Sequence, residues 1–185
     1  LLNVGKFSNS NYYKKHIAFI RQCTKKKNIA FSSMSPDYLD ELRSHPRNKH
    51  MVTSPYWSKR KYLRYKIQRG RRVPLKSKIH IHQGLDLYGK KGDPVYSLMS
   101  GKVVLAEKLF FEGNFIVIDH GNKIFTYFMH LHSISISKGD MVQAGDLIGT
   151  VGSTGVSTAA HLHISLVIRG IQVHPLSVLS LPIRN

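Results

Sequence analysis

Histidine side chains that could bind a metal ion gather in three short segments of the second half of this chain. Eight of the eleven histidines follow residue 78. His82 and Asp86 are four residues apart, His130 ends one apolar run, and His161 and His163 begin another. Residues two positions apart on a strand point to the same side of a sheet, so we expect His161 and His163 to face the same space.

Two neutral imidazoles and one carboxylate are a common set of protein ligands for catalytic zinc, with the fourth position left to water. Zinc bound in this way makes water a nucleophile near neutral pH. A structural reading stays open beside this one, because a pair of histidines on a strand can also form a solvated or hydrogen-bonded face. Because three such patterns occur in one small domain, the sequence favours the metal site and the purely structural role of these histidines equally.

The elements that would position these residues are short strands. Runs rich in Val, Ile and Phe, each bounded by Gly, Asp, Asn or Ser, predict an all-β sheet or barrel-like core without helices between the strands. Two of the runs, joined by His120-Gly121-Asn122, predict a hairpin. The predicted strands after residue 90 cover residues 94–98, 102–106, 115–119, 123–128, 147–151 and 161–168.

The first part of the chain differs from the second in net charge and in the pattern of its apolar residues. Residues 1–78 hold 20 Lys and Arg against three acidic residues, whereas residues 79–185 hold eight against seven, so almost all of the net charge of +18 lies early. Helical signals occur at residues 11–21 and after Ser35-Pro36-Asp37, where His45-Pro46 would end the helix. We expect every strand of the β domain to follow residue 56, so that residues 1–56 could be removed without unfolding it.

Composition excludes several classes of protein. Hydrophobic residues make up 42% of the chain and charged residues 21%, which is enough apolar material for a core. No apolar run approaches the ~18 residues of a membrane-spanning helix. The single cysteine, Cys23, excludes an internal disulfide and a cysteine-built zinc cluster. Because the chain begins with Leu1, we expect it to be a processed or trimmed product.

Three ordered segments resemble the signature segments of the M23 (lysostaphin/LytM-type) zinc metallopeptidases. They are His82-Gln83-Gly84-Leu85-Asp86-Leu87, Tyr127-Phe128-Met129-His130-Leu131 and His161-Leu162-His163. The glycine-rich sequence between these segments is also similar to that of the family, and the resemblance covers residues ~70 to ~178. Extra histidines at 80 and 132 are rival ligands, and Ile164-Ser165 replaces the family's frequent aromatic-acidic pair, but no departure removes a ligand.

The resemblance implies a division of the chain and roles for the residues. It implies a LytM/duplicated hybrid motif-like antiparallel sheet with an open groove at 69–185. The residues before it, 1–68, are the basic, partly helical N-terminal region that the charge and the helical signals predict. Zn²⁺ would be held by His82, Asp86 and His163, with His130 and His161 as catalytic residues that act on water and on the transition state. The implied activity is hydrolysis of peptide bonds in peptidoglycan stem or cross-bridge peptides, in cell-wall remodelling or lysis by a bacterium. The alternative is a non-catalytic, wall-binding activator of other wall hydrolases.

The basic segment at residues 57–72 leaves three interpretations open. It has eight Lys and Arg among 16 residues, with Trp57, Tyr62 and Tyr65 between them. It could be a solvated arm that packs on the barrel through its aromatic residues, or a surface that attracts an anionic wall polymer or membrane. Nucleic-acid binding is the least favoured of the three. We expect the protein in the cell envelope, periplasmic or secreted, free or anchored to the membrane through a segment that this chain lacks.

Overall fold

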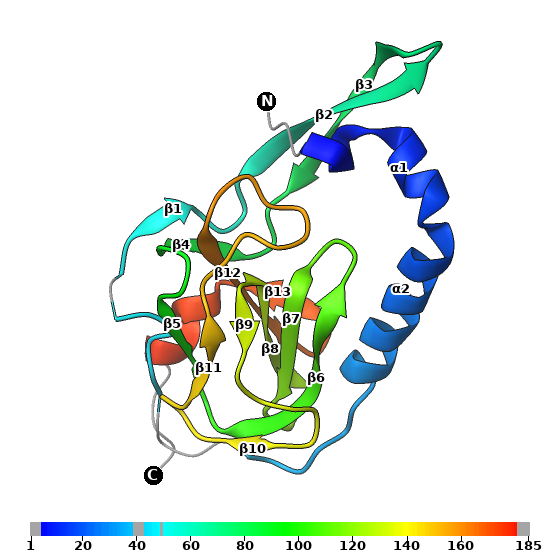
Figure 1. The fold of residues 1–185 in the computed structure, drawn as a ribbon. Helices are drawn as coiled ribbons and strands as arrows, with labels where there is room; N and C mark the ends of the chain where they lie inside the picture. The colour runs from blue at the N-terminus through cyan, green and yellow to red at the C-terminus, as the bar shows by residue number, and fades with distance from the viewer. Residues whose placement is uncertain (1–4, 39–42, 49, 181–185) are drawn as a thin grey trace.

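The computed structural model describes residues 5–38, 43–48 and 50–180, and antiparallel β-sheet dominates the described chain (Figure 1). Three helical segments come first, and all the strands follow them, before a last 3-10 helix. The elements are η1 (Gly5–Ser8), α1 (Ser10–Lys15), α2 (Ile17–Phe31), β1 (Val52–Ser54), β2 (Lys59–Gln68), β3 (Arg71–Ile81), β4 (Leu85–Tyr88), β5 (Pro94–Tyr96), β6 (Gly101–Leu109), β7 (Gly113–Asp119), β8 (Ile124–Leu131), β9 (Ser133–Ile134), β10 (Met141–Val142), β11 (Leu147–Thr150), β12 (His161–Ile168), β13 (Ile171–Val173) and η2 (Pro175–Ser180).

The main sheet runs in the order β1-β4-β12-β8-β7-β6-β10, with β13 beside β4 on the same edge of β12, which makes eight strands within the described residues. A second sheet of three short strands, β5-β11-β9, lies apart from it. The predicted all-β, antiparallel fold is therefore confirmed. The predicted hairpin is confirmed too, since β7 pairs with β8 through residues 120–123.

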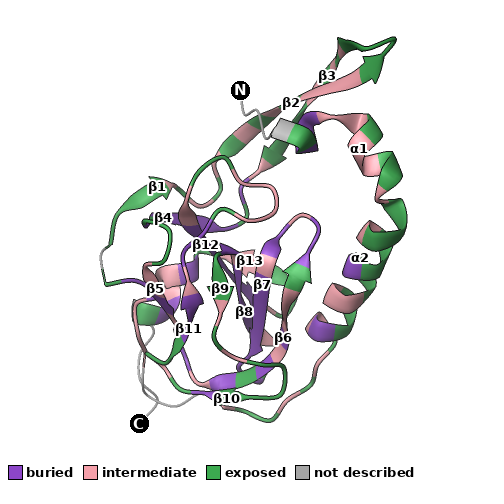
Figure 2. Cartoon of the chain, viewed as in Figure 1, coloured by how far each residue is buried: buried purple, intermediate pink, exposed green. Residues whose placement is uncertain are grey.

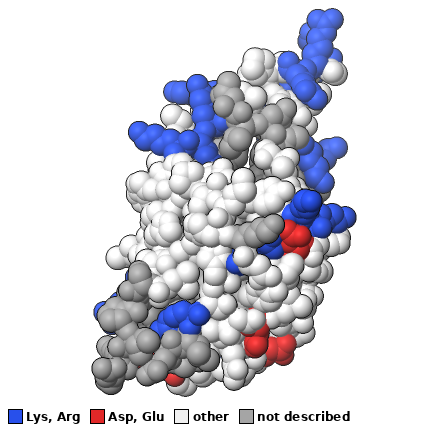
Figure 3. All heavy atoms as spheres, turned by 90° about the vertical axis from the view of Figure 1, so that its left-hand side faces the viewer, with Lys and Arg blue, Asp and Glu red and all other residues white. Residues whose placement is uncertain are grey.

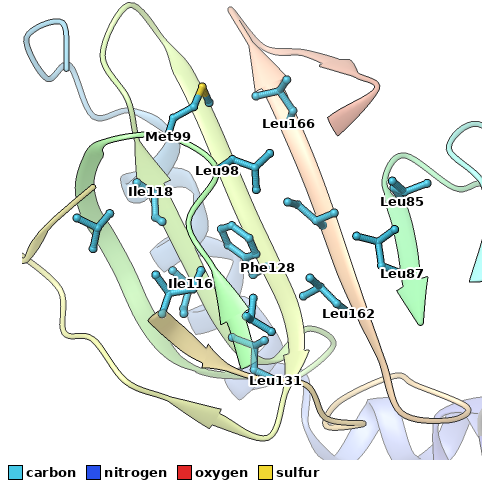
Figure 4. Close-up of a cluster of buried hydrophobic side chains, with 14 of the residues drawn as sticks. Leu85, Leu87, Leu98, Met99, Ile116, Ile118, Phe128, Leu131, Leu162 and Leu166 are labelled. Carbon is cyan, nitrogen blue, oxygen red and sulfur yellow. The ribbon is translucent and has the colours of Figure 1, made fainter. Parts of the chain in front are cut away.

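Both faces of the main sheet are buried, and the alternation along each strand divides its residues between two clusters. On β7, Ile116 and Ile118 belong to one cluster, whereas Phe115 and Val117 belong to the other. The first cluster fills the space between the main sheet and the three-stranded sheet (Figure 4). The central strands β7, β8 and β12 are accordingly buried along most of their length, whereas no residue of β2 or β3 is fully buried (Figure 2).

The N-terminal helices cover the second face of the main sheet. Phe7, Cys23 and Ala30 are buried in the cluster of that face, and Phe31 packs edge-on against Phe125 at 5.5 Å between ring centroids. Two ion pairs, Lys26 with Glu107 and Lys27 with Glu112, join α2 to β6 and to the turn after it. The helix expected after Ser35 is wrong for its described part, because residues 35–38 have no helical structure, and residues 39–42 lie outside the described residues.

The basic segment that the sequence left open forms most of a long β-hairpin. β2 and β3 pair with each other in a separate two-stranded sheet that projects from the body of the molecule (Figure 1). The turn at its tip is Arg69-Gly70, and both residues have positive φ, as two-residue hairpin turns of the primed type require. The domain boundary predicted at 68/69 thus falls inside the turn of one hairpin.

The expectation that all strands of the β domain follow residue 56 is wrong. β1, at residues 52–54, pairs with β4 and is part of the main sheet. A three-residue strand next to a basic segment leaves no period-2 pattern to recognise, since three residues are too few to establish an alternation. Among the described helices, none combines the length and the apolar character that crossing a membrane requires.

Candidate metal centre

Strand pairing brings two of the candidate ligands face to face. β12 lies antiparallel to β4 with His163 directly opposite Asp86, and directly opposed residues of an antiparallel pair share one face of the sheet. The third candidate, His82, follows the end of β3 and is held by two backbone hydrogen bonds. Its N–H donates to the Ser58 carbonyl at 2.8 Å, and its own carbonyl accepts from Trp57 N–H at 2.7 Å.

Three side-chain atoms converge at this point. Asp86 Oδ1 lies 2.8 Å from His163 Nδ1 and 3.1 Å from His82 Nε2, and the two nitrogens are 3.1 Å apart. All three side chains are buried, with 5–7% of each residue exposed. Within the described part of the chain, this is the one group of three His, Cys, Asp or Glu residues close enough to share a metal ion.

The hydrogen bonds on the far sides of the two imidazoles favour one tautomer of each neutral ring. His82 Nδ1 is 2.9 Å from the Pro55 carbonyl, which can only accept, so Nδ1–H donates and Nε2 keeps its lone pair. Ser165 Oγ donates to the Gln83 carbonyl at 3.2 Å, and His163 Nε2–H donates to Ser165 Oγ at 3.1 Å, which leaves the lone pair on His163 Nδ1.

Three acceptor atoms therefore point at one another in a buried space. A carboxylate oxygen and two imidazole lone pairs at such distances repel one another unless a cation lies between them, and nitrogen and oxygen ligands of this kind suit zinc. Backbone or hydroxyl partners on the outer nitrogens are the usual support of metal-binding histidines. The donor set of His82, Asp86 and His163 thus fits a zinc ion.

Electrostatics keep this centre in the protonation state that a metal needs. Burial raises the pKa of the Asp86 carboxyl, but when no ion lies at the centre a ring N–H of His163 or His82 can turn to this carboxylate, and such hydrogen bonds outweigh burial and hold that pKa well below its usual range. Burial lowers the pKa of His163, which favours the neutral imidazole. The carboxylate therefore stays ionised and the imidazole neutral, as metal binding requires.

Arg60 was missed by sequence reasoning, although it contacts a candidate ligand. It comes from β2, and its Nη2 donates to Asp86 Oδ2 at 2.5 Å and to Ser54 Oγ at 2.8 Å. The guanidinium thus holds the carboxylate by the oxygen that faces away from His163, so that Oδ1 stays directed at the two imidazoles. In the sequence, Arg60 is one of the eight basic residues of the segment 57–72. Nothing in that segment indicates which of the eight side chains contacts the metal centre.

The two predicted catalytic histidines lie beside the three candidate ligands and outside their group. The His130 ring centroid is 5.2 Å from that of His161 and 6.0 Å from that of His163. Nδ1–H of His130 donates to the Thr154 carbonyl, and Nδ1–H of His161 donates to the Ala159 carbonyl, both at 2.8 Å. In the neutral form of each ring Nε2 is then the acceptor, and that of His161 is 3.7 Å from Asp86 Oδ2.

An irregular backbone conformation at His130 sets the direction of its side chain. Its φ is +63°, in the left-handed region that few side chains adopt, and its N–H donates out of the β7–β8 ladder to the Glu112 carbonyl at 2.8 Å. The register between β7 and β8 shifts nearby, and such irregularities commonly re-aim a side chain beside an active site. Burial lowers the pKa of His130 to about 3, so the ring is neutral at pH 7.

The rival histidines do not join the candidate ligands. His80 is exposed on β3 and stacks edge-on against Tyr62 at 5.5 Å, and His132 is exposed after the end of β8. Ser165, which stands where the family often has another residue type, orients His163 through its hydroxyl. The sequence showed that a serine stands at position 165, but no pattern in it indicated a contact between Ser165 and His163.

The metal centre lies between two hollows of the surface. One, of about 260 Å³, is bordered by His82, His130 and His163, together with Arg60 and Tyr127. The other, of about 360 Å³, is bordered by Asp86, His130 and His161. Because His130 borders both hollows, a chain-like ligand could pass the centre with groups on either side of it.

Comparisons with known proteins agree with this geometry. The family described as Peptidase family M23 matches residues 80–175. The peptidoglycan DD-endopeptidase ShyA of Vibrio cholerae is 39% identical over 97 residues, which are 52% of this chain and 23% of that protein. The chain thus spans about a quarter of the length of this relative.

Two solved structures share the fold. A zinc-containing peptidase from Vibrio cholerae superposes with a TM-score of 0.55 at 31% identity, over 75% of this chain and 39% of that one. The catalytic domain of the antimicrobial peptidase lysostaphin from Staphylococcus simulans superposes with a TM-score of 0.51 at 34% identity, over 55% of this chain and 80% of that one. Both superpositions support the LytM-type architecture of the β domain.

Proposed function

The chain belongs to peptidase family M23, and from this we propose that it is a zinc-dependent endopeptidase that hydrolyses peptide bonds in peptidoglycan stem or cross-bridge peptides. The observation that carries the proposal is the convergence of His82 Nε2, Asp86 Oδ1 and His163 Nδ1, all as acceptors, in one buried space. The peptidoglycan substrate is supported by the name of the relative ShyA, a peptidoglycan DD-endopeptidase.

In this proposal His82, Asp86 and His163 hold the ion, and zinc supplies Lewis-acid chemistry for a peptide carbonyl and for water. Arg60 and Ser165 keep Asp86 and His163 in place through the contacts described above. These outer contacts keep Asp86 Oδ1 and His163 Nδ1 directed at the place of the ion.

His130 and His161 are the proposed proton-transfer residues. Each donates its Nδ1–H to a backbone carbonyl, so each can accept a proton at Nε2 from the attacking water. Once protonated, the same Nε2–H can donate to the developing oxyanion or to the leaving amine. The low pKa of His130, caused first by burial, keeps this ring in the accepting form across the neutral range.

An extended peptide suits the surface around the centre. The hollows bordered by His163 on one side and His161 on the other give room to residues before and after the bond that is cut. A groove with two such ends binds a chain better than it binds a compact molecule.

Two measurements on one preparation test the proposal. Metal analysis of the purified protein should find one zinc per chain, and mass spectrometry of digested, purified peptidoglycan should find peptides cut at one type of bond. A folded protein that binds no zinc would contradict the metal site. A protein that binds zinc and cuts no peptidoglycan of any cross-link type would instead be the wall-binding activator.

The basic hairpin supports a second part of the proposal, attraction to an anionic wall polymer or membrane surface. Between Lys59 and Lys78 the chain has ten Lys and Arg and no acidic residue, on two strands that project from the body. Figure 3 shows Lys and Arg side chains gathered at that end of the molecule.

Binding to anionic vesicles or wall polymer should weaken steeply as salt rises from about 50 to 500 mM, because screening shortens the reach of these charges. Binding that ignores salt would contradict this role.

Location and domain division follow as proposals. A wall peptide substrate places the protein in the cell envelope, periplasmic or secreted, and a membrane anchor outside this chain would be compatible with it. We retain a basic, partly helical N-terminal region ahead of the peptidase domain, with the qualification that β1 contributes to the main sheet. Limited proteolysis followed by mass analysis would locate the stable domain and its first residue.

A further inference from the structure

The hollow of about 260 Å³ at the metal centre continues into a larger groove, which we call the outer groove. The outer groove has a volume of about 560 Å³ and lies between the β2–β3 hairpin and the N-terminal helices. It shares Tyr62, Phe111 and Val156 with the hollow. Its helical wall is apolar and aromatic, with residues from η1, α1 and α2: Phe7, Tyr13, Ile17 and Ile20. A chain-like ligand that leaves the metal centre on this side therefore enters the outer groove.

One face of the hairpin leads from the metal centre along the outer groove. His80 lies directly opposite Arg60, and Lys78 lies directly opposite Tyr62, so the members of each pair share a face of the hairpin. Arg60 and Tyr62 are two positions apart on β2 and face the same side. Arg60 contacts Asp86, whereas Tyr62 lines both the hollow and the outer groove. This face thus connects the carboxylate ligand with Lys78.

Two cations of the hairpin border the outer groove without an acidic partner. Arg64, half-buried, and Lys78, exposed, line the groove, and among the described residues no Asp or Glu does so. Neither cation takes part in the ion pairs that Lys and Arg form within the described part of the chain. Burial raises the pKa of Tyr13 in the helical wall, and the positive charge of Arg64 lowers it. The guanidinium therefore acts electrostatically on the opposite wall of the groove.

The spacing along the hairpin matches that of an extended peptide. A strand advances about 3.3 Å per residue, so Tyr62 with its partner Lys78 lies about 7 Å beyond Arg60, and Arg64 lies about 13 Å beyond it. An extended peptide advances by nearly the same length per residue, which places these two cations about two to four residues from a bond cut at the metal centre.

We propose that Arg64 and Lys78 bind a free carboxylate of the peptide substrate, about two to four residues from the bond that is cut. This inference rests on the proposed peptidoglycan endopeptidase function and adds a specificity to it. A guanidinium can donate two parallel hydrogen bonds to a carboxylate, and the ammonium of a lysine adds a point charge. Apolar walls strengthen such an attraction, because they screen charges less than water does. Stem peptides of peptidoglycan contain acidic residues whose carboxylates are free or amidated, and the outer groove selects the free form.

The test uses pairs of substrates and a matched pair of variants. Synthetic cross-linked peptides carry one acidic residue at the second, third or fourth position from the bond that is cut, with its carboxylate either free or amidated. At one of these positions the wild type should cut the free form with a kcat/KM about 10-fold or more above that of the amidated form, mainly through KM. The double variant Arg64→Gln, Lys78→Gln should lose this preference.

The control removes the same charge from the other face of the hairpin. Lys59 and Lys61 are exposed and alternate with Arg60 on β2, so they face away from the outer groove. The double variant Lys59→Gln, Lys61→Gln should keep the preference for the free carboxylate. If it loses the preference as fully as the first double variant does, the net charge of the hairpin is responsible, and the proposed carboxylate site is refuted.

The outcomes separate this inference from the function on which it rests. If the wild type cuts the free and amidated forms equally at every position, or if Arg64→Gln, Lys78→Gln keeps the preference, the carboxylate site is refuted while the peptidase function stands. A wild type that cuts none of the peptides refutes the peptidase function, and the inference with it. If the double variant does not fold, Lys78→Gln alone changes an exposed side chain and should reduce the preference; an unchanged preference again refutes the site.

Discussion

One methyl group at Gly84 should dismantle the metal centre. A Cβ built at this position would lie 2.4 Å from Ser165 Oγ and 2.5 Å from Cε1 and Nε2 of His163. Ordinary contacts between such atoms begin near 3.5 Å, so the imidazole and the hydroxyl must each retreat by about 1 Å. Zinc–ligand distances tolerate only about 0.2 Å. Gly84→Ala should therefore weaken zinc binding by about 100-fold or more, at a stability cost of about 1–3 kcal/mol for overpacking.

The assay is a zinc titration of metal-stripped protein against a fluorescent chelator, with urea unfolding measured on the same preparation. Gly139→Ala is the matched control, because nothing lies within 4 Å of its Cβ while its φ of +104° makes alanine strained. That strain costs about 1–3 kcal/mol and leaves the centre intact. If Gly84→Ala binds zinc as the wild type does, the contact between residue 84 and His163 is not what positions the ligand.

Further predictions concern catalysis, packing and pH. His130→Ala should keep its zinc and lose about 10²-fold in turnover, whereas His132→Ala should keep both the zinc and the turnover. Loss of zinc from His130→Ala would show that His130 is a metal ligand. Phe31→Ala should lower the free energy of unfolding by about 2 kcal/mol in urea titrations, since Phe31 packs on Phe125; an unchanged value would mean that α2 does not stabilise the sheet. Burial lowers the pKa of His120 to about 4, below its unfolded value near 6.5, so stability should fall as pH drops from about 6.5 to 4, by on the order of 3 kcal/mol. The non-titrating variant His120→Asn should show a shallower fall over that range, and an equal slope would assign the effect elsewhere.

The sequence predicted the β core because its signal is local. Short runs of Val, Ile and Phe between turn residues are where the strands lie, as in β7, β8 and β12. It also contained the three residues that converge, since the spacing of His82 and Asp86 and the pair at 161 and 163 are visible in the chain. Their convergence depends on the register of β4 against β12, which spacing alone does not define.

The rest depended on contacts between distant segments. Arg60 reaches Asp86 across 26 residues, and nothing distinguishes it from the other basic residues of the run until β2 is placed. α2 continues ten residues beyond the predicted end at Arg21, because Lys25, Lys26 and Lys27 interrupt the apolar pattern while remaining good helix formers. Glu112 resembles an ordinary turn residue until the helix that covers it is present.

The position of β1 matters for how the chain avoids self-association. β4 is only four residues long, carries Asp86 in its middle, and is bordered by β1 on one side and β12 on the other. A fragment that began at residue 69 would leave the outer side of β4 without its partner, with unpaired backbone groups between the buried Leu85 and Leu87. Such a bare edge is a template for pairing with another molecule. The three residues Val52–Ser54 therefore cover the outer edge of the strand that carries Asp86. The same short segment thus protects the chain from edge-to-edge association and supports the strand of a metal ligand.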